Sequence, residues 1–78
     1  MPLFYFDIYN DEVTLDDEGI ELPDVEVARA RAIGGARDLA CDTVRRGHLV
    51  GHHRIEIMDA DRKCVGTVRF DEAVEIRP

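Results

Sequence analysis

The chain has 78 residues, of which 45% are hydrophobic and 35% are charged, and its formal net charge is −7. A single domain of this size buries only about 60% of the surface that its unfolded chain exposes, so its core is small and a partner or a second copy would add stability. The acidic balance argues against nucleic-acid binding, because it repels a phosphate backbone, and no apolar run approaches the ~20 residues of a membrane span.

Residues 1–22 are predicted to form an acidic β-hairpin. Phe4, Phe6 and Ile8 alternate with other positions, which is the period of a strand with one apolar face, and Val13 and Leu15 resume the alternation. This segment has seven acidic residues and no Lys or Arg, so it carries the whole acidic excess of the chain. We interpret its acidic turn as a solvated tip that discourages edge-to-edge association.

Residues 24–46 are predicted to form one helix. Asp24 can cap the free amides at its start, and Gly47 is a natural stop. The 3.6-residue period gathers one apolar stripe that should face the sheet, consisting of Val25, Ala28, Ala32, Ile33, Ala36, Leu39, Ala40, Thr43 and Val44. Gly34 and Gly35 interrupt good helix formers at a cost of about 1 kcal/mol each relative to alanine. The pair indicates close packing of the helix backbone, with a kink as the alternative.

Residues 47–53, GHLVGHH, hold all three histidines of the chain. His48, His52 and His53 are the only candidates for a metal site. The two glycines argue against a helix, and in an extended chain His48 and His52 would lie ~13 Å apart, too far to share one zinc ion. We therefore interpret the segment as a polar loop.

Residues 54–70 are predicted to form a second hairpin. Ile55 and Ile57 alternate with polar residues before the turn at residues 59–62, and Val68 and Phe70 alternate after it. Residues 71–78 have too little pattern to place and are treated as a tail. Cys41 and Cys64 are too few for a disulfide framework and are predicted to be free, buried thiols.

Together these elements predict a single α+β domain, a two-layer sandwich in the order ββαββ. One helix lies across one face of a four-stranded antiparallel sheet. The residues expected to meet the helix are Phe4, Phe6, Ile8, Val13, Leu15, Ile55, Ile57, Val68 and Phe70. The opposite face, with Asp7, Arg54 and Glu56, should face water.

The chain also resembles a known family. The stretches MPLFYFDIYN, DDEGIELPDVEVARARA and HRIEIMDADRKCVGTVRF are similar to those of small bacterial proteins of about 80 residues, common in soil and plant-associated species. The EGIELPD block is the most specific part of the match. That family is a domain of unknown function, so the resemblance implies a chain that folds by itself and transfers no catalytic residue.

No catalytic motif is present and serine is absent, so we expect no enzymatic activity and no cofactor. The start of the chain lacks a basic secretion leader, which favours a cytoplasmic location. The leading hypothesis is a non-enzymatic cytoplasmic protein-interaction or assembly module, with an unknown protein partner or a homodimer and no contact with nucleic acid or membrane. The alternative is a metal- or small-ligand-binding domain that uses the histidine loop.

Two surfaces are candidates for partner binding. The outer sheet face is expected to present Tyr5, Tyr9 and Met58 beside its charged residues. The exposed side of the helix is expected to present a narrow stripe of small residues, which includes Val27, Ala30, Gly34 and Cys41.

Overall fold

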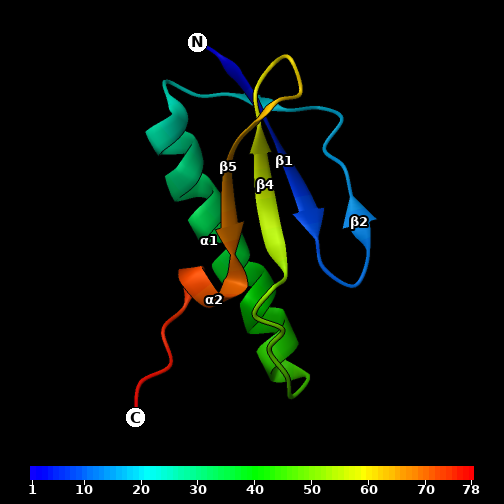
Figure 1. Cartoon of the computed structure of the whole chain (residues 1–78), viewed down its shortest axis with the longest axis vertical. Coiled ribbons are helices and arrows are strands. Elements are labelled where there is room, and N and C mark those ends of the chain that lie inside the picture. The colour runs from blue at the N-terminus through cyan, green and yellow to red at the C-terminus, as the bar shows by residue number, and fades with distance from the viewer.

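The computed structural model describes residues 1–78. Its elements are β1 (Leu3–Tyr9), β2 (Val13–Thr14), β3 (Ile20–Glu21), α1 (Val25–Arg45), β4 (Arg54–Met58), β5 (Cys64–Arg69) and α2 (Phe70–Ala73). The strands form one antiparallel sheet, and α1 crosses one of its faces (Figure 1). The predicted α+β class is therefore confirmed. No helix of the chain combines the length and the apolarity needed to cross a bilayer.

The sheet has five strands, so the predicted count of four is wrong. Its order is β2-β1-β4-β5, and β3 also pairs with β1. β2 pairs with Ile8 and Tyr9, whereas β3 pairs with Leu3 and Phe4 near the other end of the same edge. The reason lies in the middle of this edge, where the backbone amide of Phe6 donates a hydrogen bond to the Asp16 carboxylate at 3.1 Å instead of to a strand carbonyl. The predicted ββαββ order becomes βββαββα.

Val13 and Leu15 were expected in the core, and this prediction is wrong. Val13 pairs with Tyr9. Directly paired residues share a face of the sheet, so Val13 lies with Tyr9 on the face away from α1. Val13 is 62% exposed and Leu15 is 57% exposed. The pairing thus turns Val13 away from the core, and Leu15 follows the end of β2 and is exposed as well.

The core has small residues on the helix and large ones on the sheet. The buried residues of α1 are Ala28, Ala32, Ala36, Ala40 and Thr43, and they face Phe4, Ile55, Ile57, Val68 and Phe70. A helix whose buried stripe is mostly alanine can approach the sheet closely. Val25 and Val44 are exposed, contrary to prediction. Val25 lies in the first turn of α1 and Val44 in the last, and Thr43 beside Val44 is the buried residue at that end.

The ends of α1 follow from local hydrogen bonding, as predicted. The Asp24 carboxylate accepts a hydrogen bond from the Val27 amide at 2.9 Å. At the other end Gly47 has φ +93°, and the Gly47 and His48 amides donate to the carbonyls of Val44 and Thr43. This pair of bonds satisfies carbonyls that the helix leaves free.

The segment after β5 is more ordered than a simple tail. Phe70, expected as the last strand residue, begins α2 and is fully buried. The Arg37 guanidinium on α1 donates to the Ala73 carbonyl at 2.7 Å, which ties α2 to the long helix. The expectation of buried thiols is wrong, because Cys41 on α1 and Cys64 at the start of the edge strand β5 are both exposed.

Candidate functional site

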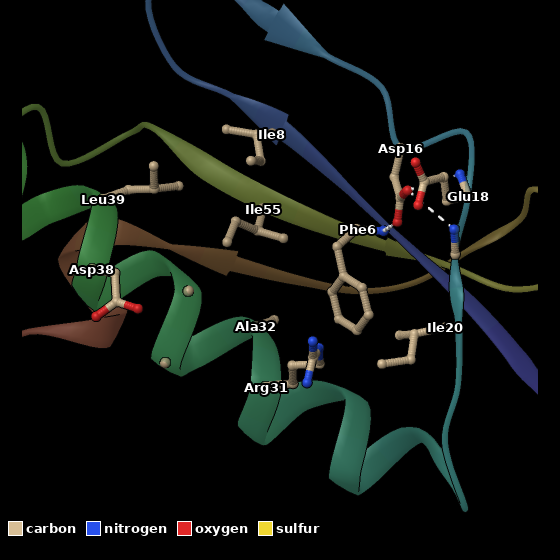
Figure 2. Close-up of a pocket in the computed structure, with 13 residues that line it drawn as sticks. Phe6, Ile8, Asp16, Glu18, Ile20, Arg31, Ala32, Asp38, Leu39 and Ile55 are labelled. Atoms are coloured by element: carbon tan, nitrogen blue, oxygen red, sulfur yellow. Dashed lines mark hydrogen bonds between the residues drawn. The ribbon is translucent and has the colours of Figure 1, made fainter.

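The largest hollow of the surface is a groove between α1 and the β1 side of the sheet, with a volume of about 710 Å³. We call it the α1–β1 groove (Figure 2). Its apolar lining includes Phe6, Ile8, Ala32, Leu39 and Ile55. Figure 2 shows the Phe6 ring pointing from β1 toward α1. The segment that carries Asp16 and Glu18 lies on the side of Phe6 away from α1. The volume lies within the ~300–1,000 Å³ typical of ligand pockets.

Three charged groups on the groove are free to interact. Glu18, Arg31 and Asp38 form neither an ion pair nor a side-chain hydrogen bond within the chain. Arg31 and Asp38 both lie on α1 and are exposed. The groove therefore combines an apolar lining with charges that the chain itself does not use.

The two glycines of α1 have different surroundings. A Cβ on Gly35 would lie 3.2 Å from the Ile55 Cδ1 atom, so Gly35 allows the helix to pack on the sheet. A Cβ on Gly34 would meet no atom within 4 Å. Neither glycine has a positive φ. Gly34 therefore lowers helix stability without a packing reason inside this chain.

This contrast gives a first prediction. Gly34→Ala is expected to raise the free energy of unfolding by about 1 kcal/mol, because alanine is the better helix former and meets no obstacle. Gly35→Ala should gain less or lose stability, because Ile55 must shift. Urea denaturation of both variants measures the difference, and equal effects of the two substitutions would contradict it.

A buried charge network holds the strand segments beside the groove. Asp7 was expected to face water, but it is only 1% exposed. Its carboxylate accepts hydrogen bonds from the Arg62 guanidinium at 2.7 Å and from the Asp16 backbone amide at 2.9 Å. The expectation failed because Arg62, in the turn between β4 and β5, folds back over the sheet and stacks on the Tyr5 ring at 4.8 Å.

Asp16 organises the loop between β2 and β3. Its carboxylate accepts hydrogen bonds from the backbone amides of Phe6, Glu18 and Gly19 at 3.0 to 3.1 Å. Burial alone would raise the pKa of Asp16, but these amides and the Arg62 charge together lower it below its ordinary value of 3.8. Asp16 is therefore ionised at neutral pH and shapes the groove wall.

The outer sheet face is less available to a partner than predicted. The Arg54 guanidinium lies over the Tyr9 ring, 4.3 Å from its centroid, and donates a hydrogen bond to Glu56 at 2.8 Å. Arg62 covers Tyr5 in a similar way. Both tyrosine rings therefore have one face occupied by an arginine of the same chain, and Met58 is half-buried beside them.

Of the seven predicted partner-binding residues, the structure places only Gly34 in the groove. Val27, Ala30 and Cys41 are exposed on α1, while Tyr5, Tyr9 and Met58 belong to the opposite face of the sheet. Glu18, Arg31 and Asp38 were not predicted as partner-binding residues. The sequence does contain a pattern that could have indicated two of them, because Arg31 and Asp38 are seven residues apart and lie at equal distances from the glycine pair. This spacing places both on one side of the helix.

The three histidines have different surroundings and are not gathered into one cluster. His48 and His52 are exposed, but His53 is only 5% exposed and its ring packs edge-on against Phe70. The His53 Nε2 atom lies 3.6 Å from Asp11 Oδ1, and the Nδ1 atom has no hydrogen-bond partner. No group of three or more His, Cys, Asp or Glu side chains is placed to hold a metal ion. His53 differs from a polar loop residue because the Phe70 amide bonds to its carbonyl at 2.8 Å and draws it against the core.

Comparison with known proteins agrees with the resemblance seen in the sequence. Residues 3–71 match the model of a family described as "Domain of unknown function (DUF6894)". Neither the curated proteins nor the solved structures contain a match to the chain. The match leaves the function unknown but spans most of the chain, and the protein therefore belongs to the DUF6894 family.

Proposed function

We propose that this protein is a small non-enzymatic protein-interaction module that binds a partner through the α1–β1 groove. The observation that carries the proposal is the groove itself, which joins the half-buried side chains of Phe6, Ile8 and Leu39 to three unpaired charges. Apolar side chains beside free charges are typical of surfaces that bind other proteins.

The chemistry of the groove favours binding over catalysis. No histidine, cysteine or hydroxyl side chain lines it. Its Asp16 carboxylate is already engaged by three backbone amides, and Asp7, the buried acid nearby, is engaged by Arg62 and the Asp16 amide. The two carboxylates of the groove that have no partner, Glu18 and Asp38, are exposed to solvent. General acid-base catalysis needs a titratable group held within reach of a substrate proton, usually in a site that excludes water. We propose on these grounds that the protein is not an enzyme.

The cellular location, the source and the class of partner are also part of the proposal. The acidic composition is in keeping with a cytoplasmic location, and the resemblance of the sequence supports a bacterial source of the soil or plant-associated kind. The acidic surface supports a protein partner over nucleic acid.

The test is to fill the groove without damaging the fold. Gly34→Trp adds a large side chain at a position that meets no atom within 4 Å, and Ala60→Trp adds the same side chain at an exposed turn outside the groove. Both variants and the unmodified protein are used to capture partners from the native host, with circular dichroism to confirm folding. The proposal expects a partner that the unmodified protein and Ala60→Trp retain and Gly34→Trp loses. Capture that is equal with all three, or no capture above an empty support, would contradict it.

A further inference from the structure

The exposed face of α1 has a charge pattern that is symmetric about the glycine pair. Arg31 and Asp38 are seven residues apart, so they lie on the same side of the helix, separated by ~10 Å along its axis. The midpoint between them falls between Gly34 and Gly35. Arg31 and Asp38 are both exposed and neither has a partner within the chain.

A helix with this pattern is complementary to itself in one orientation. If a second α1 lies antiparallel, with a two-fold axis through the glycine pair, Arg31 of each copy faces Asp38 of the other. The same relation brings Arg45, which also has no ion pair, toward Asp24 of the other copy. A parallel arrangement would oppose like charges instead. Two-fold interfaces repeat each contact, so one pairing becomes two.

The glycine pair permits the close approach that such an interface needs. At the crossing point Gly34 presents only backbone, and a Cβ there would meet no atom within 4 Å. Helices pack at ~8–10 Å between axes, and the shorter distances require small residues at the contact. Within one copy Gly34 costs helix stability and contributes no packing, whereas at this crossing its missing side chain is required.

We propose that the partner of the α1–β1 groove is a second copy of this chain, whose α1 lies antiparallel across Gly34 and Gly35. The proposal rests on the proposed function and names the partner of the same surface. The second helix would cover the exposed side of the groove, where Leu39 is half-buried. The net charge of −7 on each copy opposes association at long range, so the interface is best measured at ~0.15 M salt, where the screening length is ~8 Å.

The experiment is a charge exchange followed by analytical ultracentrifugation of the full chain. The unmodified protein is expected to show a monomer–dimer equilibrium. Arg31→Asp and Asp38→Arg each place like charges opposite one another, and each should weaken the dimer at least tenfold. The double variant restores opposite charges and should return to within about threefold of the unmodified protein. An equimolar mixture of the two single variants should also associate, because each then meets its opposite.

Controls separate a contact from a general charge effect. Arg77→Asp and Asp61→Arg change the same charges at exposed positions outside the groove and should leave the dimer unchanged. Gly34→Trp should abolish the dimer while circular dichroism shows an intact fold.

Two results of the charge exchange would overturn the inference. One is a single variant that dimerises as well as the unmodified protein, and the other is a double variant that fails to recover. A strictly monomeric protein that still loses a captured partner on Gly34→Trp substitution would reject the second copy as occupant and leave the proposed function standing. A dimer that survives Gly34→Trp would reject the second copy as the occupant of the groove, and the capture comparison would still decide the proposed function.

Discussion

Arg62→Ala is expected to lower the free energy of unfolding by about 3 kcal/mol, the largest effect predicted for this protein. The substitution leaves the Asp7 carboxylate, whose side chain is 2% exposed, without the guanidinium that neutralises it at 2.7 Å. Breaking a buried ion pair by removing one partner costs about 3–5 kcal/mol. The Arg62 side chain is 40% exposed, so water can reach the vacated space and the cost should lie at the lower end. For a domain of this size that is a large part of the total stability.

Two matched variants separate the causes. Arg62 has φ +62°, a conformation that glycine adopts without strain, so Arg62→Gly should be about 1 kcal/mol more stable than Arg62→Ala. Arg62→Lys keeps the positive charge but loses the planar fork and the stacking on Tyr5, and should fall between alanine and the unmodified protein. Urea denaturation at pH 7 measures all three. An Arg62→Ala variant within about 0.5 kcal/mol of the unmodified protein would show that Asp7 is not held by this ion pair.

Asp16→Ala is expected to cost about 2 kcal/mol at pH 7, because three backbone amides lose a charged acceptor. The amide of Phe6 is the most costly of the three, since it lies in the middle of β1 and the bond is partly buried. The Gly19 bond is also partly buried, whereas the Glu18 bond is exposed and that amide can turn to water.

The same residue makes stability depend on pH, in a direction that follows from its lowered pKa. The folded protein binds the Asp16 proton less readily than the unfolded chain, whose pKa is the ordinary value of 3.8. The contribution of Asp16 is therefore fully present above that pH and is lost as the pH falls through the lower pKa of the folded state. Asp16→Asn keeps an acceptor oxygen but cannot titrate.

The measurement is a series of urea denaturations between pH 7 and pH 3. The unmodified protein should lose stability on acidification more steeply than Asp16→Asn, and the two curves should approach one another below pH 3.8. Parallel curves over the whole range would contradict the role given to Asp16. Asp16→Ala should also loosen the loop between β2 and β3, which lines one side of the α1–β1 groove. The affinity for a partner or for a second copy should therefore fall together with the free energy of unfolding.

Several features of the fold could be predicted because they depend on neighbours in the chain. The bounds of α1 follow from Asp24 and Gly47, whose capping bonds reach only three to five residues. The strand faces of Ile55, Ile57 and Val68 follow from simple alternation. The candidate site could be predicted only in part. Gly34 was expected on an exposed contact surface, but the groove beside it was not.

The features that were missed depend on contacts between distant segments. Alternation alone placed Val13 and Leu15 in the core, whereas Asp16 bonds to the amide of Phe6, ten residues away, and divides the expected second strand. Asp7 looked like an exposed acid because its counter-charge, Arg62, is 55 residues away. His53 looked like a loop residue because its contact with Phe70 forms only when β5 closes beside β4.

The sequence by itself determined the helix, the apolar faces of the long strands and the acidic character of the first segment, because propensity, capping and charge are properties of short stretches. The tertiary structure decided the five-strand sheet, the burial of Asp7 and His53, and the α1–β1 groove. Each of these depends on where segments meet in space. A one-residue shift of register or one long-range ion pair decides which side chains face the core, and local pattern carries no information about either.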